Sequence, residues 1–373
     1  MKILMAAGAT GGHITNAINL SVYLKNNYED VDIEFVISAN INFSRLLNEK
    51  GFKAHTIPAG PLPLRVSFGY ITFLVKFLQS FIKSVIIINK FNPDIITAFG
   101  SYSTVPVVLA NCIRFNKARV ILHEQNVIPG KANALLLRAA DKAAVSFCRS
   151  EKYFGAKTVF TGYPLKEELR KVSRKEALDF FGLRADRVTI LVMGGSQGAD
   201  FINRLIINAI NAFKPAIINK MQIIHLAGER GYEFVRRRYD NIEFRQVKIF
   251  SFLDKMEYAL SACDLAVARA GGASLAELTA MGKPSILIPY PYAGGHQGEN
   301  ARYIEENKAA IVFNQEGLDE DKFRSALLEL ILDKRKLQAM SQNSKRLGSF
   351  DANEKLTKVI FEVLKKSNGN TGR

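Results

Sequence analysis

Two segments of the chain share one layout, in which a short apolar strand leads into a glycine-rich loop and the loop opens a helix. The first has apolar residues 2–7, the loop GATGGH at residues 8–13 and a helical pattern that continues to Leu24. The second has apolar residues 188–193, the loop GGSQGA at residues 194–199 and a helical pattern that continues to Ile210. A strand, a glycine loop and a helix in this order begin a doubly wound α/β domain. The repeated layout therefore predicts two such domains.

The length of the chain agrees with two domains. Its 373 residues exceed the roughly 250–300 at which a single hydrophobic core stops growing. Glycine and proline interrupt the pattern at residues 161–164, so we expect an N-terminal domain over 1–163, a second domain over 164–345 and a C-terminal segment over 346–373. A final helix at about 353–366 is expected to pack back toward the N-terminal domain. Further strands are expected at residues 33–38, 95–99, 120–123, 143–147, 222–227, 265–268 and 285–289.

The composition narrows the class of protein. Hydrophobic residues make up 48% and charged residues 23%, which indicates a folded globular chain rather than a disordered or fibrous one. The cysteines Cys112, Cys148 and Cys263 are odd in number and lack zinc-site spacing, so a disulfide scaffold is not expected and a reducing compartment fits best. The net charge is +16, of which +9 falls on residues 1–163 and +7 on 164–373. This excess indicates an anionic partner, namely nucleic acid, a phosphorylated ligand or an acidic membrane surface.

The longest apolar stretch runs from Tyr70 to Ile88, but Lys76, Gln79 and Lys83 interrupt it. It therefore falls short of the roughly 18–20 uninterrupted apolar residues of a membrane span. In a helix, Lys76, Lys83 and Lys90 share one face. One interpretation is a core helix with a narrow solvated stripe. The other is a helix that also meets lipid, with its lysines at the headgroups.

The segment before this helix favours the second interpretation. It is an apolar and basic loop without an obvious core to join, and it adds Leu62, Leu64, Arg65 and Phe68 to Lys76 and Lys83 as candidate membrane contacts. The first residues of the chain carry one lysine and only a short apolar run, so we interpret them as a strand and not as a secretion signal.

The glycine loops predict an anion site. Glycine lets backbone N–H groups approach an anion, and a helix N-terminus adds positive potential. The dinucleotide pattern G-x-G-x-x-G and the P-loop pattern both fail in the two loops. Two glycine loops in one chain favour a phosphate-bearing ligand, although structural turns explain many single ones.

Two more segments predict ligand contacts at the carboxyl edge of the second sheet. Residues 269–278 (RAGGASLAEL) again place small residues and a hydroxyl at a helix start. Glu277 in this helix is either a carboxylate that stabilises the helix dipole or an acceptor for sugar hydroxyls. Residues 289–301 form a loop rich in glycine, proline and amide side chains directly after an expected strand.

The set of motifs, taken in their order along the chain, resembles the MurG family of glycosyltransferase family 28. These are the UDP-N-acetylglucosamine transferases that add the second sugar to lipid I in peptidoglycan synthesis. The resemblance covers nearly the whole chain. Its motifs are residues 8–13, 100–103 (GSYS), 123–133 (HEQNVIPGKAN), 161–166 (TGYPLK), 194–199, 269–277 and His296-Gln297.

The resemblance implies an α/β GT-B fold, with two Rossmann-like doubly wound domains that face each other across a cleft. It implies an inverting transfer from UDP-GlcNAc to the C4 hydroxyl of the N-acetylmuramoyl unit of lipid I, giving lipid II. The expected partners are UDP-GlcNAc, undecaprenyl-linked lipid I and an anionic membrane surface, without nucleic acid and without a cofactor. The expected location is peripheral, on the cytoplasmic face of the plasma (inner) membrane.

The resemblance also assigns site residues. The acceptor diphosphate would lie near Gly8, Ala9, Gly100, Ser101, Tyr102 and Ser103. The donor contacts would be Thr10, Gly11, Gly12, Asn126, Lys166, Ser196, Leu253, Gly272, Ala273, Ser274, Leu275, Ala276, Glu277 and Gln297.

The sequence departs from the family pattern at several positions. Ala9 stands where glycine is usual, Asn16 where proline is usual, and Tyr163 where asparagine is usual. Lys166 replaces a common arginine, which exchanges a two-pronged donor for a point charge. Gly295 stands where aspartate is common.

The chemistry requires a base for the acceptor hydroxyl and stabilisation of the departing UDP. His13 is the first candidate base, with a role as ligand of the acceptor diphosphate as its alternative. Glu124 is the second candidate. His55 and His225 are interpreted as structural strand residues, and His296 belongs to the loop after a strand without an assigned role.

Two Asp-x-Asp pairs, at residues 30–32 and 319–321, are typical of metal-dependent transferases. The first precedes a strand and the second has the pattern of a helix start, so we interpret both as structural and expect no metal site.

Two other functions stay open from the residues alone. One is another enzyme with the same fold, either a lipid glycosyltransferase or a UDP-sugar epimerase, although an epimerase would not need the apolar basic segment at residues 61–90. The other is a non-catalytic basic protein that binds membrane or nucleic acid, although the dense basic run at residues 236–238 is short and is more typical of a solvated helix face.

Overall fold

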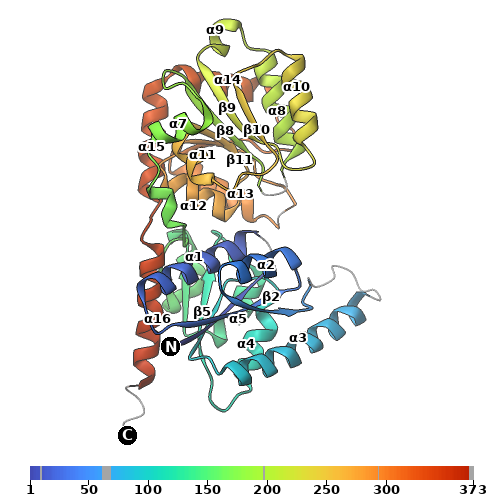
Figure 1. Ribbon diagram of the computed structural model, residues 1–373, viewed down its shortest axis with the longest axis vertical. Helices are drawn as coiled ribbons and strands as arrows, with labels where there is room; N and C mark the ends of the chain where they lie inside the picture. Colours follow the sequence, from blue (N-terminus) through green and yellow to red (C-terminus); the bar gives the residue numbers. More distant parts are fainter. Residues whose placement is uncertain (9–10, 61–68, 196–197, 293, 369–373) are drawn as a thin grey trace. The chain divides into compact units, whose positions relative to one another are not determined.

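The computed structural model describes residues 1–8, 11–60, 69–195, 198–292 and 294–368. The chain divides into two compact units: unit 1 is Met1–Leu165 with the chain from Asp351 on, and unit 2 is Lys166–Phe350. Each unit is built on a parallel sheet with helices packed against it (Figure 1). The fold class expected from the repeated strand–loop–helix layout is confirmed.

Within the described residues, unit 1 holds a seven-stranded sheet in the order β3-β2-β1-β4-β5-β6-β7. The chain proceeds from β1 outward to β3 and then returns to β4 beside β1, so the direction of strand addition reverses between β1 and β4. The strands are β1 (Lys2–Ala7), β2 (Asp32–Ser38), β3 (Lys53–Ile57), β4 (Ile95–Ala98), β5 (Arg119–Glu124), β6 (Lys142–Val145) and β7 (Thr158–Phe160).

Helices cover both faces of this sheet. One core cluster joins the sheet to α1 and α16, and a second joins it to α3, α4 and α5. The last helix is tied to unit 1, because Asn353 Nδ2 donates to the carbonyl of Leu165 at 2.8 Å and Leu356 is fully buried in the first cluster. The helices are α1 (Gly11–Asn27), α2 (Ile41–Glu49), α3 (Gly69–Phe91), α4 (Thr104–Cys112), α5 (Lys131–Leu136), α6 (Glu151–Phe154) and α16 (Ala352–Asn368).

Unit 2 repeats the architecture with a six-stranded sheet, among the described residues, in the order β10-β9-β8-β11-β12-β13. Here the direction of strand addition reverses between β8 and β11. The strands are β8 (Val188–Met193), β9 (Met221–Leu226), β10 (Val247–Phe250), β11 (Leu265–Ala268), β12 (Ser285–Leu287) and β13 (Ala310–Val312).

The helices of unit 2 also lie on both sides of its sheet. One core cluster contains residues of α8, α10 and α14, while Leu260 of α11 and Leu275 of α12 are buried outside that cluster. The helices are α7 (Arg174–Phe181), α8 (Asp200–Asn211), α9 (Pro215–Ile218), α10 (Tyr232–Asn241), α11 (Met256–Ala262), α12 (Gly272–Ala280), α13 (His296–Glu306), α14 (Glu320–Leu332) and α15 (Lys334–Leu347).

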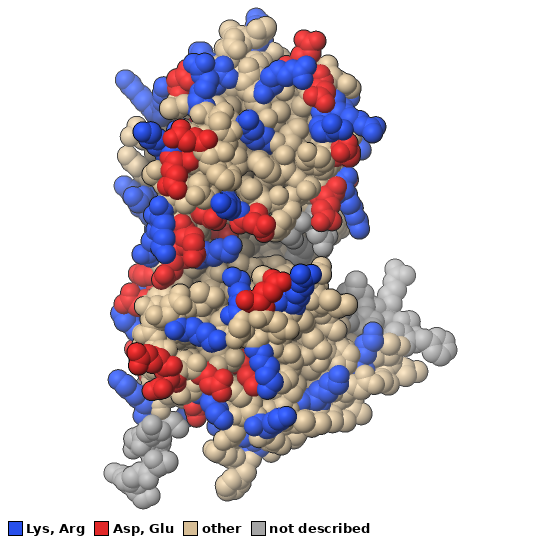
Figure 2. Space-filling model, in the orientation of Figure 1, with Lys and Arg blue, Asp and Glu red and all other residues tan. Residues whose placement is uncertain are grey.

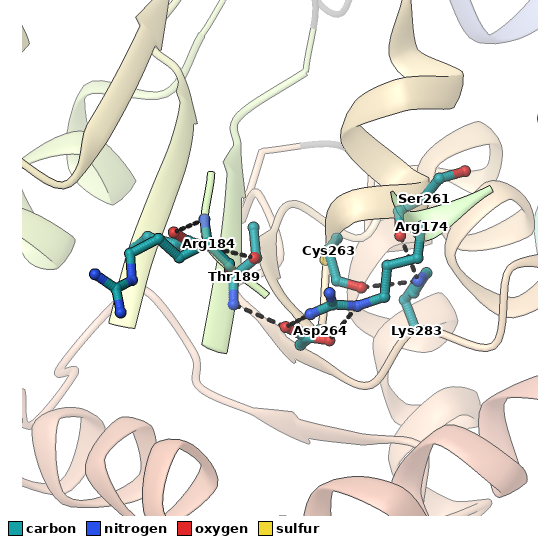
Figure 3. A network of polar contacts seen from close by, with 8 residues as sticks. Arg174, Arg184, Thr189, Ser261, Cys263, Asp264 and Lys283 are labelled. Atoms are coloured by element: carbon teal, nitrogen blue, oxygen red, sulfur yellow. Dashed lines mark hydrogen bonds and ion pairs between the residues drawn. The ribbon is translucent and has the colours of Figure 1, made fainter. Parts of the chain in front are cut away.

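A polar network fixes the amino end of the second sheet (Figure 3). The Asp264 carboxylate accepts from Arg174 Nη2 at 2.6 Å and from the N–H of Thr189 at 2.8 Å, which joins the starts of β8 and β11. Lys283 Nζ donates to the carbonyl of Cys263 at 2.7 Å. Burial raises the pKa of the Cys263 thiol to about 12, so this cysteine stays protonated and acts as a packing residue. The opposite end of the sheet carries the glycine loops.

Candidate functional site

The predicted acceptor residues lie at the reversal point of the first sheet. Gly8 follows β1, Gly100 follows β4, and α1 begins with Gly11, Gly12 and His13. Open α/β sheets bind ligands at the carboxyl ends of the strands at such a point. The strand order therefore brings together sequence motifs that are about ninety residues apart.

His13 packs against the loop that follows β4. A side chain added at Gly100 would place its first carbon 3.4 Å from His13 Cδ2 and 3.4 Å from Asn133 Nδ2. A side chain at Gly8 would collide with Ser101. Close approach to Ser101 therefore requires glycine at position 8, whereas at Gly100 the positive φ of 78° is what favours glycine. The contacts of the two glycines show that His13 and Ser101 lie in one small region. Ala9 and Thr10, predicted here as well, lie outside the described residues.

Hydroxyl groups hold the loop after β4 in an unusual conformation. Gly100 and Ser101 have φ values of 78° and 79°. A positive φ costs free energy for a residue other than glycine, so the surrounding contacts must maintain it at Ser101. Thr104 Oγ1 donates to the Ser101 carbonyl at 2.8 Å, and buried Ser103 donates to the Ala7 carbonyl at 3.0 Å. Ser103 is thus used within the fold, whereas Tyr102 is exposed.

Glu124, the second candidate base, serves as the anchor of its own loop. One carboxylate oxygen accepts from the N–H of Asn126 at 2.9 Å and from Asn126 Nδ2 at 3.2 Å. The other accepts from the N–H of Gly130 and from Asn133 Nδ2, both at 2.9 Å. A carboxylate has about four acceptor positions, and all are used here. With the residue only 2% exposed, this geometry argues against its predicted role as a base.

We expect Glu124→Ala to lower the free energy of unfolding by about 2–4 kcal/mol, because several buried donors lose a charged acceptor. Urea unfolding measures this loss, and Glu151→Ala, an exposed glutamate in α6, is the matched control. Unchanged stability together with a large fall in kcat would instead restore Glu124 as the base.

Asn133 is the residue that the site assignment missed. It was part of a motif but had no predicted role. Its Nδ2 donates to the His123 carbonyl at 3.0 Å and to Glu124, and its Oδ1 is buried without a hydrogen-bond partner among the described residues. Its neighbours Gly100 and His13 place this amide at the acceptor region. In the sequence, the only signal that pointed to Asn133 was its place in the motif at residues 123–133.

In unit 2, the first predicted donor loop also lies at a reversal point, after β8. Gly195 and Gly198 have φ values of 90° and 76°, and the N–H of Gly198 donates to the Gly195 carbonyl at 3.0 Å. Side chains at Gly194 or Gly198 would collide with backbone atoms. Gly194 and Gly198 are therefore closely packed against neighbouring backbone just before α8. Ser196, predicted to contact the donor, lies outside the described residues.

The second donor segment begins α12, after β11 and therefore beside the first. Leu275 is buried in the domain, so only its backbone is available to a ligand, while Ala273, Ser274 and Ala276 are half-buried. Half-buried Glu277 has no hydrogen-bond donor among the described residues. Burial raises the pKa of Glu277 to about 7, and the charge of Lys166 opposes part of the rise. Lys166, also a predicted donor residue, is therefore close enough for its charge to act on the Glu277 carboxyl group.

Gln297 and its surroundings stabilise the loop after β12. Gln297 Oε1 accepts from the N–H of Tyr290 at 2.9 Å. Arg269 Nη1 donates to the carbonyls of Ile288 and Pro289 at 3.0 and 3.2 Å. Gln297 is thus near the predicted donor segment but is already engaged. Leu253 follows the edge strand β10, farther along the sheet order from the reversal point than the other donor residues.

His225, His55 and the second Asp-x-Asp pair have local roles. His225 is fully buried, with hydrogen-bond contacts to the Tyr239 hydroxyl at 2.9 Å and to Asn203 Oδ1 at 3.0 Å. His55 pairs with Glu34 at 2.6 Å on neighbouring strands. Asp319 is the N-cap of α14, as the sequence indicated.

The first Asp-x-Asp pair lies at the amino edge of the first sheet. It lines a groove of about 600 Å³ there, opposite the glycine loops. The groove carries acidic and basic side chains together, so it has no clear preference for an anion. Within the described part of the chain, no group of three or more His, Cys, Asp or Glu side chains is arranged to hold a metal ion.

Comparison with protein families gives two matches. The Glycosyltransferase family 28 N-terminal domain matches residues 3–145, and the Glycosyltransferase family 28 C-terminal domain matches residues 189–356. These ranges contain both glycine loops.

Curated relatives match along the full chain. The UDP-N-acetylglucosamine–N-acetylmuramyl-(pentapeptide) pyrophosphoryl-undecaprenol N-acetylglucosamine transferase of Halothermothrix orenii is 38% identical over 378 residues, covering 98% of this chain and 100% of the relative. The protein of the same name from Desulforamulus reducens is 34% identical over 372 residues, covering 98% and 99%.

Solved structures share the fold. MurG of Acinetobacter baumannii has a TM-score of 0.77 at 21% identity, covering 97% of this chain and 100% of that chain. A putative UDP-N-acetylglucosamine 2-epimerase from Listeria monocytogenes has a TM-score of 0.71 at 16% identity, covering 98% and 97%. At these identities the likeness establishes the GT-B architecture alone.

Proposed function

The chain belongs to glycosyltransferase family 28, and on this premise we propose that it transfers N-acetylglucosamine from UDP-GlcNAc to lipid I, giving lipid II for peptidoglycan synthesis. The observation that carries this function is full-length similarity, at 32–38% identity, to relatives named for that transfer. The enzyme is a hexosyltransferase. Its expected activity is release of UDP that depends on added lipid I, and absence of acceptor-dependent UDP release would contradict it.

We assign the donor to unit 2 and the acceptor to unit 1. The glycine loop before α8 and the start of α12 would offer backbone N–H groups to the donor diphosphate. Lys166 would be a nearby cation, and Glu277 would accept hydrogen bonds from sugar hydroxyls. Gln297 would have to exchange its contact with Tyr290 to reach the donor. Gly8, Gly100 and Ser101 would hold the acceptor diphosphate by the same backbone chemistry.

The proposed reaction is a single displacement with inversion. The C4 hydroxyl of the N-acetylmuramoyl unit attacks C1 of GlcNAc and gives its proton to His13, and UDP leaves with the electrons of the C1–O bond. Backbone N–H groups at the starts of α8 and α12 stabilise the charge that develops on the departing diphosphate. His13 is favoured over Glu124 because it lies beside Gly100 and Ser101, whereas Glu124 is saturated by its own loop.

The membrane surface is the second part of the proposal, and α3 supports it. By length and composition alone, Tyr70–Phe91 is the only helix, in the part of the chain that the structure describes, that is long and apolar enough to cross a membrane. Its inner face packs into unit 1, where Ile88 and Phe91 belong to a core cluster. Because one face of α3 packs into the core of unit 1, its apolar composition is only weak evidence that it crosses a membrane.

The outer face of α3 is the unusual feature. It exposes a wide apolar stripe, with Ile71 61%, Leu74 60%, Leu78 58%, Ile82 51% and Ile86 60% exposed. A core helix with only a narrow solvated stripe, which was one of the two interpretations from the sequence, would not expose such a face. Lys76, Lys83 and Lys90 are also exposed, the helix has no acidic residue, and Figure 2 shows blue but no red residues along it. Leu62, Leu64, Arg65 and Phe68 lie outside the described residues.

The loop after α4 extends this apolar surface. Phe115 is fully exposed and Ile113 is 66% exposed. Between them, Arg114 donates to the side chains of Asn89 and Asn92 at 3.1 and 2.7 Å, which holds the loop at the end of α3. An apolar face with flanking lysines fits the interface of an anionic bilayer. We therefore place the enzyme peripherally on the cytoplasmic face of the membrane, where the acceptor's lipid tail resides.

We expect Lys76→Glu with Lys83→Glu to weaken binding to anionic liposomes at least about tenfold, since each nearby cation contributes about 1 kcal/mol. Leu78→Ser with Ile82→Ser should weaken the part of binding that persists in high salt. Co-sedimentation with phosphatidylglycerol vesicles measures both effects. Arg236→Glu with Arg238→Glu on α10 is the matched control, and equal loss in that control would remove α3 as the contact.

A further inference from the structure

We propose that Tyr163 is a positioning residue. It lies in the segment that leads out of unit 1, and it holds in place the first turn of α1, which carries His13. The inference rests on the proposed role of His13 as the base. Tyr163 does not itself need to touch either substrate. It would act through the backbone of the turn that carries the base.

A hydrogen bond links Tyr163 directly to the start of α1. The Tyr163 hydroxyl donates to the carbonyl of Gly12 at 2.9 Å, and Gly12 is the residue before His13. Tyr163 is only 3% exposed, so its ring is held in the interior, and the bond itself is partly buried. The turn contains Gly11 and Gly12, which restrict the backbone least of all residues. A bond from outside the helix is therefore well placed to limit its motion.

A buried polar network supports the tyrosine ring. The ring meets His123 edge-on, with centroids 6.2 Å apart. Burial lowers the pKa of His123 to about 4, so this histidine is neutral at physiological pH. His123 Nε2 lies 3.2 Å from the Gly162 carbonyl, and so carries the proton and donates to it, which leaves Nδ1 to accept from Asn16 Nδ2 at 3.3 Å. Asn16 Nδ2 also donates to Gln125 Oε1 at 3.0 Å.

The backbone of the segment that contains Tyr163 is hydrogen-bonded to unit 1 on both sides of the tyrosine. Gly162, with a φ of 81°, donates its N–H to the Val145 carbonyl at 3.1 Å. The carbonyl of Pro164 accepts from Asn19 Nδ2 of α1 at 3.0 Å. Asn19 and Tyr163 thus join the segment directly to α1, and Asn16 joins it indirectly, through His123. Together these contacts make one hydrogen-bonded assembly of the helix start and the exit of the chain toward unit 2.

Tyr163→Phe isolates the contribution of the hydroxyl, because the ring can keep its packing against His123. We expect kcat for GlcNAc transfer to fall about tenfold, with the KM for UDP-GlcNAc within about twofold of wild type. The donor KM should be spared because the assigned donor contacts of unit 2 are unchanged. Tyr258→Phe, which removes a hydroxyl that donates to Glu176 at 3.1 Å, is the matched control and should keep wild-type kcat.

A double-mutant cycle tests whether Tyr163 acts through His13. In a His13→Ala background, measured by single turnover, Tyr163→Phe should cause no further loss, because the group that it positions is gone. Wild-type kcat in Tyr163→Phe, or the same fold loss in both backgrounds, would overturn the proposal. Asn16→Leu is a second variant that should show the same pattern, with UDP-GlcNAc binding measured to verify folding. Failure of the proposed function is distinguishable, because the unmodified protein would then transfer no GlcNAc.

Discussion

Replacing His13 by alanine is expected to lower kcat for GlcNAc transfer by about 10²–10⁴-fold, the usual contribution of a positioned general base. The physical reason is that the acceptor hydroxyl must lose its proton as it attacks, and His13 is the titratable group that packs against Gly100 in the acceptor region. Steady-state kinetics with saturating UDP-GlcNAc and lipid I measure the loss.

The pH dependence and a control separate the base from its alternative. The decline of kcat at low pH that reflects protonation of the base should disappear in His13→Ala. His55→Ala removes a histidine that pairs with Glu34 in the first sheet and should leave kcat unchanged. A rise in the acceptor KM with nearly normal kcat would instead make His13 a ligand of the acceptor diphosphate.

The second large effect is expected at Glu277. Replacing it by glutamine should raise the KM for UDP-GlcNAc about 10–100-fold, since a hydrogen bond to a charged group is worth about 1.5–3 kcal/mol. Because the pKa of Glu277 is raised to about 7, donor affinity in the wild type should improve as pH rises through that value and the carboxylate forms. The variant should lack this dependence. Glu233→Gln on α10 is the control, and wild-type donor kinetics in Glu277→Gln would remove this residue from the site.

The same carboxyl group affects stability with the opposite sign. Its folded-state pKa of about 7 lies above the ordinary value of 4.5, so the folded protein holds the proton more tightly than the unfolded chain. The ligand-free enzyme should therefore lose stability as pH rises from about 4.5 to about 7. Glu277→Gln should remove this contribution. Urea unfolding at several pH values tests it, and an unchanged slope in the variant would contradict the raised pKa.

The interior of both sheets was predictable from the sequence, and their edges were not. Every strand expected from an apolar run is present. The strands without an expected segment are β3, β7, β10 and β13, for which only His55 had been interpreted as a strand residue. These four strands are the edges of the two sheets. An edge strand is half-buried, as the patterns of β7 and β10 show, so its sequence lacks the continuous apolar run of a central parallel strand.

The candidate site was predictable as a set of motifs, but not at the level of side-chain partners. Glycine positions and strand order placed His13 beside Gly100. The saturation of Glu124 depends on contacts from residues two to nine positions later, and no pattern in the sequence states that both carboxylate oxygens are occupied.

For two departures from the family pattern, only the structure shows that the residues interact with a common neighbour. Asn16 and Tyr163, which replace a usual proline and asparagine, lie in the same buried network around His123. From the sequence they were separate substitutions almost 150 residues apart. Their shared network is a consequence of packing β5, α1 and the segment after β7 together.

Transfer of radiolabel from UDP-[¹⁴C]GlcNAc to lipid I tests the central claim most directly. The enzyme, incubated with both substrates in detergent or vesicles, should move label into the lipid fraction in equal amount to the UDP released, and neither should occur without lipid I. Conversion of the labelled nucleotide sugar to its 2-epimer without an acceptor, or UDP release with no label in the lipid fraction, would contradict it.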